Sequence, residues 1–290
     1  MSAELWSNIV ATRSDHMFED APKYGVVDGF PVIIKINDKF AGLYTFNIPK
    51  DGWMFNLSDE TLTQAIVCAE GTAENQAAAF KELALVDESD FSLEYVSNED
   101  DSDWVRTSLN RLISACMNSD GTDLDTTIAQ YLDWQSAIDF CCYACLIGGY
   151  DLMVKNYLLV TLDGTKWYFS AYDLDSTFGL YWRGDSYYNP RTCHPQPDSY
   201  ALKHKLMELI CKYKKDELKE RYAYLRENVM SICDVHTAFY NFTANIPAVA
   251  LDADWKKWQT IPNTSGNNIA QIMDWYRSRV DVLDKVMEQL

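Results

Sequence analysis

The chain has 290 residues, of which 48% are apolar and 13% aromatic, so it can bury a substantial core and is not globally disordered. With 43 acidic and 25 basic residues, its formal net charge is -18. Such a charge argues against sequence-independent nucleic-acid binding and against docking on an anionic membrane. No stretch approaches the roughly 20 apolar residues that span a bilayer.

The N-terminus lacks the basic region and apolar run of a signal peptide, so we expect none. Three of the eight cysteines, Cys141, Cys142 and Cys145, lie in an apolar run with no second pair. These cysteines are better interpreted as reduced thiols packed in the core than as ligands of a zinc ion. We therefore expect a cytoplasmic protein, or a component of a coat or phage-type assembly.

The first third of the chain predicts strands. Residues 30–49 read as a β-hairpin around an Asn-Asp-Lys turn, and residues 64–70 and 90–96 are further strand candidates. Residues 74–83, between those two strands, fit a helical turn or a loop. A helix is predicted over 101–118 because apolar residues recur on one face of it: Trp104, Leu109, Leu112, Ile113 and Cys116.

The rest of the chain predicts mainly helices. A helical region over 127–149 should break near Asp133 and stop at two glycines. A hairpin with an Asp-Gly turn then spans 156–173. From about residue 202 the chain is mainly helical, with helical segments over 201–230, 238–246 and 267–290. This order predicts an α+β fold in a single domain, 1–290, with a β-rich part (about 1–97) and a helical part (98–290).

Polar side chains bracket the 156–173 hairpin. Asp151 and Asn156, five positions apart, precede its first strand, and Asp173 and Asp175 end its second. In phosphoryl transfer, an acid that orients the attacking hydroxyl is followed at this interval by an amide that ligates Mg²⁺, and a later acid also holds metal. Taken singly, the same residues also fit ordinary turn formers and helix caps.

The segment "DLMVKNYLLVTLDGTKWYFSAYDLDSTFG" resembles the signature of the spore-coat CotH kinase family. The resemblance extends to the hairpin "FPVIIKINDKFAGLYTF", the strand "FSLEYV" and the C-terminal helix. It implies an atypical protein-kinase-like fold that uses ATP with Mg²⁺ or Mn²⁺ to phosphorylate Ser or Thr hydroxyls of a protein. The resemblance implies that Asp151 is the catalytic acid and Asn156 a metal ligand. It implies that Asp173 is the principal metal ligand and Asp175 a second ligand or a structural acid. Phe178 and Gly179 would shape the turn that presents the acids.

The chain departs from the family pattern in two ways. The strand over 64–70 carries no lysine for the nucleotide phosphates, and Lys50 and Lys81, with Lys35 as a third, are the nearby substitutes. The chain also begins at what looks like the first helix of the family, as expected of an N-terminally shortened member. These departures leave a second hypothesis, a catalytically impaired kinase-like binding or structural module.

A glycoside hydrolase with paired carboxylates is a third hypothesis, but the Asp-to-Asn interval has no role in that chemistry. The aromatic residues that follow the acids fit either a substrate groove or packing at the core edge: Tyr181, Trp182, Tyr187 and Tyr188.

Overall fold

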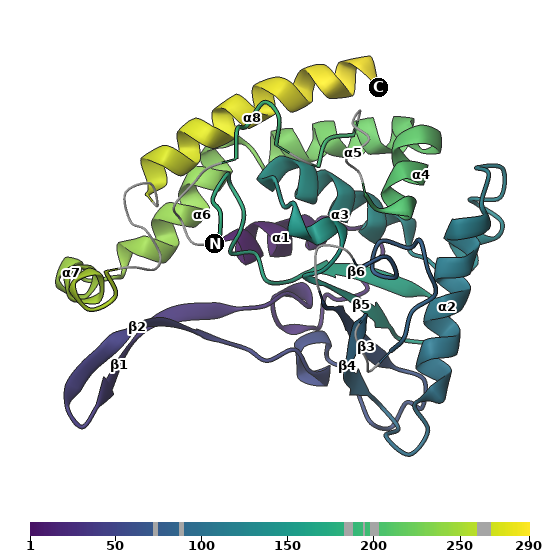
Figure 1. The fold of residues 1–290 in the computed structure, drawn as a ribbon, viewed down its shortest axis with the longest axis horizontal. Coiled ribbons are helices and arrows are strands. Elements are labelled where there is room, and N and C mark those ends of the chain that lie inside the picture. The colour runs from purple at the N-terminus through teal and green to yellow at the C-terminus, as the bar shows by residue number, and fades with distance from the viewer. Residues whose placement is uncertain (72–74, 87–89, 183–187, 194, 198–202, 260–267) are drawn as a thin grey trace.

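A four-stranded antiparallel sheet, in the order β4-β3-β5-β6, forms the centre of the computed structural model (Figure 1). Its strands are β3 (Ala65–Ala69), β4 (Phe91–Val96), β5 (Tyr157–Thr161) and β6 (Trp167–Ala171). The structure describes residues 1–71, 75–86, 90–182, 188–193, 195–197, 203–259 and 268–290. Mixed helices and small sheets confirm the α+β class predicted from the sequence.

The pairing of β3 with β5 joins the two halves of the chain in one sheet. Leu158 to Thr161 pair with Cys68 to Ala65, so a strand from the β-rich part lies beside the hairpin of the helical part. The predicted Asp-Gly turn closes that hairpin, with Gly164 at φ 72° and the Asp163 carboxylate accepting hydrogen bonds from the next backbone N–H groups. The ends of β3, β5 and β6 thereby come to one edge.

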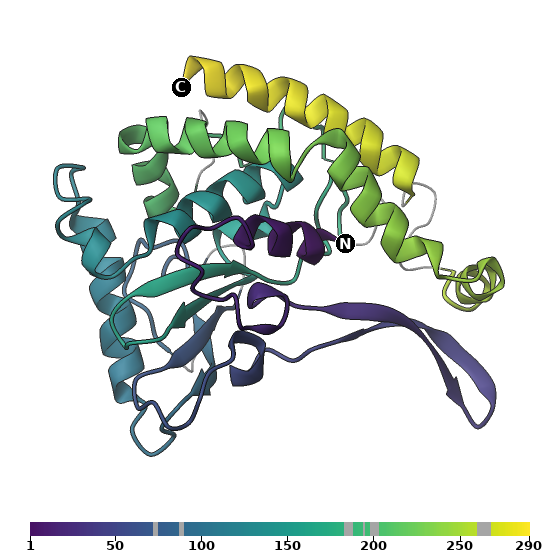
Figure 2. The same ribbon diagram turned by 180° about the vertical axis from the view of Figure 1, so that it is seen from behind.

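Helix α3 (Trp134–Ile147) lies between this sheet and an outer layer of helices (Figures 1 and 2). Every residue from Ser136 to Ile147 is buried. The one charged residue among them, Asp139, is paired with Arg13 and Arg221. The Asp133 side chain begins α3 by accepting a hydrogen bond from Ser136 N (2.6 Å), and Gly148, at φ 64°, ends it. The predicted break near Asp133 and the glycine stop are therefore confirmed.

The remaining helices surround this centre. They are α1 (Ser2–Val10), α2 (Asp103–Asn118), α4 (Lys205–Tyr213), α5 (Lys215–Asn228), α6 (Ile232–Ala244), α7 (Ala248–Lys257) and α8 (Ile269–Gln289). The sequence did not indicate α7, and the helical run it suggested near residue 214 is divided into α4 and α5. Residues 75–83 form turns and a loop, in agreement with the predicted helical turn or loop. No helix in the described ranges combines the length and the apolar character needed to cross a bilayer.

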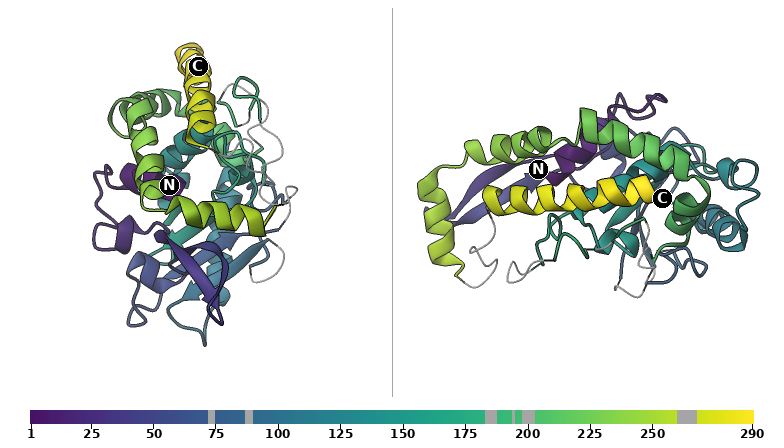
Figure 3. Two further views of the ribbon diagram at one scale, coloured as in Figure 1. Left: turned by 90° about the vertical axis from the view of Figure 1, so that its left-hand side faces the viewer. Right: turned by 90° about the horizontal axis from the view of Figure 1, so that it is seen from above.

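A second, two-stranded sheet projects from the body as an arm (Figures 1 and 3). It consists of β1 (Gly29–Ile36) and β2 (Lys39–Asn47), which confirms the predicted hairpin. Asn37 and Asp38 make a two-residue turn with φ of 50° and 60°, a conformation that Asn and Asp tolerate. At its far end, β2 contacts α7.

Candidate functional site

Asn156 lies where three strands end. Its backbone N–H donates to Ala69 O at the end of β3 (3.0 Å), and its carbonyl accepts from Tyr172 N just after β6 (3.2 Å). The side chain Nδ2 donates to Asp173 O (3.4 Å). Asn156 and Asp173 have φ of 62° and 49°, a left-handed conformation that Asn and Asp adopt more readily than other residues. The structure thus brings Asn156 and Asp173 together at one sheet edge.

Asp151 reaches the same edge from a short 3₁₀ turn, Asp151–Met153, between the end of α3 and β5. Its carboxylate forms an ion pair with Lys155, with Nζ and Oδ2 3.2 Å apart and each side chain 28% exposed. The interval of four residues is spanned by a helical-type hydrogen bond from Lys155 N to Asp151 O (2.9 Å). Lys155 is therefore a direct partner of the predicted catalytic acid, which the sequence analysis did not anticipate.

The carboxyl of Asp173 has a pKa raised above its ordinary value. Burial is the largest cause, followed by the negative charge of Asp175, while Lys155 lowers the pKa and Asp151 and Glu70 raise it further. Within the described ranges, no hydrogen bond to the Asp173 carboxylate oxygens is found. Asp173 therefore lies among negative charges of Asp175, Asp151 and Glu70, which a nearby cation would offset.

Lys50 lies close to this edge, between two glutamates. Its Nζ is 3.0 Å from Glu70 Oε1 and 2.7 Å from Glu94 Oε1, and 5.2 Å from the centre of the Tyr172 ring. Burial alone lowers the pKa of the Lys50 ammonium, but the hydrogen bond to Glu94 and the other negative neighbours outweigh it, so the pKa is raised. Lys50 therefore stays a cation. It lies against the ring of Tyr172, which is the residue before Asp173 in the sequence.

Glu70 and Glu94 were missed in the sequence analysis. The sequence signal was their position in predicted strands: Glu70 directly follows β3, and Glu94 lies within β4. A carboxylate on a buried sheet requires a cation nearby. The pKa of Glu70 is lowered because its contacts with Lys50 and Cys68 outweigh the opposing effect of burial.

The three lysines proposed for phosphate binding lie in different places. Only Lys50 reaches the sheet edge that carries the acids. Lys81 is exposed in the loop after β3, where its charge faces His204, and Lys35 is exposed on the arm. Geometry therefore favours Lys50 over the other two.

Among the described residues, one group of three side chains is close enough to hold a metal ion together: Cys68, Glu70 and Glu94. Their ligand atoms all lie within 4.8 Å of one another. The Lys50 ammonium already offsets one of the two carboxylate charges of this group. Asp151, Asp173 and Asp175 do not form such a close set. Their arrangement is a wider acidic edge, with the Asn156 amide among them.

Helix α8 fixes the turn that follows the acids. Phe178 N donates to Ile147 O (2.7 Å), and the Phe178 ring packs against Phe239 and Tyr276. Gly179 has φ 84°, and a Cβ added there would lie 2.3 Å from the Trp275 ring. Only glycine fits this position, because backbone conformation and space both exclude a side chain.

Aromatic side chains border Asp151. Tyr150 stacks on Tyr188, with ring centres 6.3 Å apart, and Tyr181 lies 6.0 Å from Tyr188. The pKa of the Tyr188 phenol is raised by burial first and then by the charge of Asp151. Trp182 is 54% exposed at the end of this row. Tyr187, also named from the sequence, lies outside the described residues.

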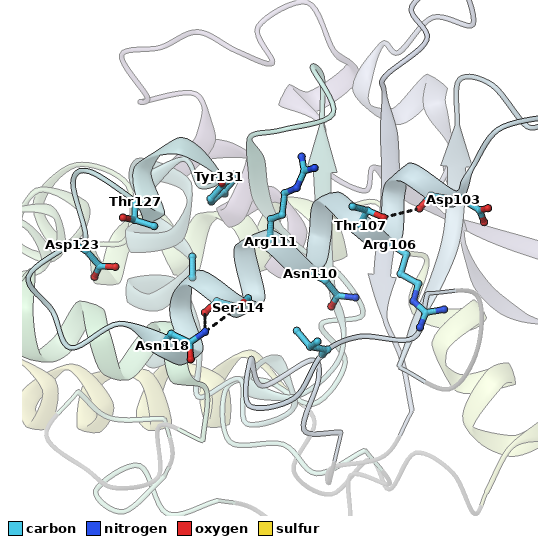
Figure 4. A pocket seen from close by; sticks show the side chains of 12 residues that line it. Asp103, Arg106, Thr107, Asn110, Arg111, Ser114, Asn118, Asp123, Thr127 and Tyr131 are labelled. Atoms are coloured by element: carbon cyan, nitrogen blue, oxygen red, sulfur yellow. Dashed lines mark hydrogen bonds between the residues drawn. The ribbon is translucent and has the colours of Figure 1, made fainter.

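A cavity of about 510 Å³ opens beside Asp173 and Asp175. Its other walls come from α1, α6 and the base of the arm, and they include Glu4, Ser7, Lys23, Thr45, Asn47 and Phe242. A larger hollow, about 950 Å³, lies over the outer side of α2 (Figure 4). Its two arginines, Arg106 and Arg111, point in different directions, and it contains none of the predicted site residues.

The model of one protein family, described as CotH kinase protein, matches residues 16–283. This match covers most of the chain and includes every residue predicted for the site. No curated protein matches the sequence significantly. The chain belongs to the CotH kinase family.

Proposed function

We propose that this member of the CotH kinase family is a metal-dependent protein kinase that transfers the γ-phosphate of ATP to Ser or Thr hydroxyls of a protein. The observation that carries the proposal is the position of Asn156. Its backbone bonds to the ends of β3 and β6, and its side chain bonds to Asp173, directly after the turn that carries Asp151. An acid, an amide and a second acid at one edge are the parts that phosphoryl transfer requires.

The donor atoms at this edge fit Mg²⁺ or Mn²⁺. The carboxylates of Asp173 and Asp175 are hard oxygen ligands. The raised pKa of Asp173 reflects burial first and then the charge of Asp175, and a bound cation would offset both. Because Asn156 Nδ2 faces Asp173 O, its amide oxygen is left for a ligand position. When bound, the ion would neutralise negative charge that develops on the phosphate groups during transfer.

The chain's own residues supply the remaining roles. Asp151 orients the acceptor hydroxyl and accepts its proton, while its ion pair with Lys155 holds the carboxylate in place. Lys50 provides a cation for phosphate oxygens. In protein kinases the corresponding lysine pairs with a glutamate, and here Glu70 and Glu94 take that role.

One observation favours the second hypothesis, a kinase-like binding module without catalysis. Lys50 is engaged by two glutamates, and their combined negative charge opposes the approach of a triphosphate. In an active kinase, one of these contacts must yield to the nucleotide. In a binding module, both would persist and nucleotide would not bind.

Calorimetric titration with ATP and Mg²⁺ or Mn²⁺ separates the two hypotheses. A kinase should bind nucleotide only with metal, and a ligand at 100 times its Kd stabilises the native state by roughly 2.7 kcal/mol. Asp151→Ala should retain ATP binding but lose phosphate transfer to dephosphorylated casein or to the chain itself, whereas Asp173→Ala should lose both. Lys81→Ala is the matched control and should change neither. Absence of nucleotide binding by the folded wild type would exclude the kinase.

A further inference from the structure

The arm has two outer edges, one along β1 and one along β2, and helix α7 covers only the edge of β2. There, Asp254 Oδ1 accepts a hydrogen bond from Leu43 N (2.7 Å), and Lys257 Nζ donates to Phe40 O (3.2 Å). The arm also approaches α7 closely at Gly42, where an added Cβ would lie 3.1 Å from Trp258 Nε1. Side chains of α7 therefore satisfy backbone groups that β2 turns away from β1.

The register shows which groups of β1 point outward. Leu43 is opposite Ile33, and Phe40 is opposite Lys35. Because Leu43 N–H and Phe40 C=O point away from β1, Ile33 and Lys35 turn their own backbone groups away from β2. Within the described part of the chain, nothing hydrogen-bonds to those groups. Pro31, two residues before Ile33, occupies the same outward position, where its missing N–H is harmless.

This open edge is also apolar. Four side chains of β1 are large, hydrophobic and exposed, with exposed fractions of 59% for Phe30, 44% for Ile33, 39% for Ile34 and 64% for Ile36. Lys35 is the one charged residue of β1. Exposed edge strands are normally protected by charges, bulges or a covering element, because an open edge pairs with other strands. The arm projects from the body (Figures 1 and 3), and α7 contacts β2.

We propose that β1 pairs antiparallel with β1 of a second copy of this chain, about a two-fold axis at Ile33. In this register the two Ile33 residues exchange their N–H and C=O bonds, and each Lys35 N–H reaches the Pro31 carbonyl of the other copy. Val32 then lies opposite Ile34, a β-branched pair of the kind that stabilises sheets. Moving the axis to Lys35 would place two ammonium groups opposite each other, which is unfavourable.

A second copy suits this edge for two reasons. First, each chain has one open and one covered arm edge, so the pairing is isologous and closes at two copies. Secondly, the register about Ile33 is self-complementary and sets each Lys35 opposite Pro31 rather than opposite the other lysine. The formal charge of -18 on each chain opposes association, and the projecting arms reduce this repulsion because they keep the bodies apart. Because salt screens repulsion between exposed charges, the dimer should become tighter as ionic strength rises.

Sedimentation of the full chain over a series of protein and salt concentrations tests the proposal. The wild type should reach a dimer that tightens with salt. Ile33→Lys should weaken association at least tenfold, and so should Ile33→Pro, which removes the outward N–H while the hydrogen bonds of Val32 and Ile34 to β2 remain. Phe46→Lys is the matched control on β2: Phe46 is 62% exposed on the same arm, and its replacement should change association less than twofold. Circular dichroism would verify that each variant remains folded.

Hydrogen exchange adds a residue-level readout. Association should protect the amides of Ile33 and Lys35, whereas Leu43, already bonded to Asp254, should not change. A wild type that stays monomeric throughout, a dimer unaffected by both Ile33 variants, or equal weakening by Phe46→Lys would each overturn the proposal. Growth beyond two copies would overturn the closed register.

Discussion

Replacing Lys50 with methionine tests the charge arrangement at the sheet edge most directly. The change removes the cation between Glu70 and Glu94 and keeps a side chain of similar length. The ligand atoms of Glu70, Glu94 and Cys68 all lie within 4.8 Å of one another, so the two carboxylates would then face each other with no cation between them. Lys50 and Glu94 are only 21% and 16% exposed, which limits relief by solvent.

The magnitude follows from Coulomb's law. Two negative charges at this separation repel by about 1 kcal/mol in water and roughly 3 kcal/mol at the effective dielectric constant of a protein surface. We therefore expect Lys50→Met to lower the free energy of unfolding by about 1–3 kcal/mol at pH 8. The melting temperature should fall by several degrees, at roughly 2–4 °C for each kcal/mol. At pH 4 or below, protonation of the glutamates should remove most of the difference.

Differential scanning calorimetry across this pH range is the assay, with Lys81→Met as the matched control for loss of one lysine. The same samples should show whether Mg²⁺ and ATP raise the melting temperature, and Lys50→Met should abolish that rise. If Lys50→Met and Lys81→Met had equal melting temperatures at pH 8, repulsion between Glu70 and Glu94 would not lower the stability of the protein, and the reasoning would be refuted. Retention of the nucleotide effect would exclude Lys50 from phosphate binding.

Other changes probe the site and the arm separately. The raised pKa of Asp173 means that, without metal, its ionisation opposes folding as pH rises from its ordinary value through the raised one. Asp173→Asn should therefore melt higher than wild type at pH 8 in chelator yet lose stabilisation by Mg²⁺, as thermal denaturation would show. Gly179→Ala, with a Cβ 2.3 Å from Trp275 and φ 84°, should destabilise by about 2 kcal/mol or more in denaturant titrations. Asp254→Ala should open the β2 edge and allow assemblies larger than dimers in sedimentation, whereas Asp252→Ala should not.

Local patterns predicted much of this fold. The arm, the hairpin of β5 and β6, and the cap and stop of α3 each depend on turn or capping residues a few positions apart. The position of Asn156 beside Asp173 follows in the same way, because an Asp-Gly turn brings the two ends of one hairpin together. Helix α7 could not be predicted, since its contacts with β2 connect residues more than 200 positions apart and its sequence has only weak amphipathic character.

The charge network around Lys50 shows the limit of such patterns. Strand pairing sets Ser92 opposite Cys68, and the Ser92 hydroxyl hydrogen-bonds to both Glu70 and Glu94. Lys50 reaches the two glutamates from an irregular segment after the arm, so no spacing along the chain links the three. The family pattern directed attention to a lysine within a strand, and β3 has none. A lysine from outside the strand nevertheless places its ammonium beside the end of that strand. The missing strand lysine is therefore weaker support for an inactive module than the sequence suggested, because the charge is present and only its origin in the chain has changed.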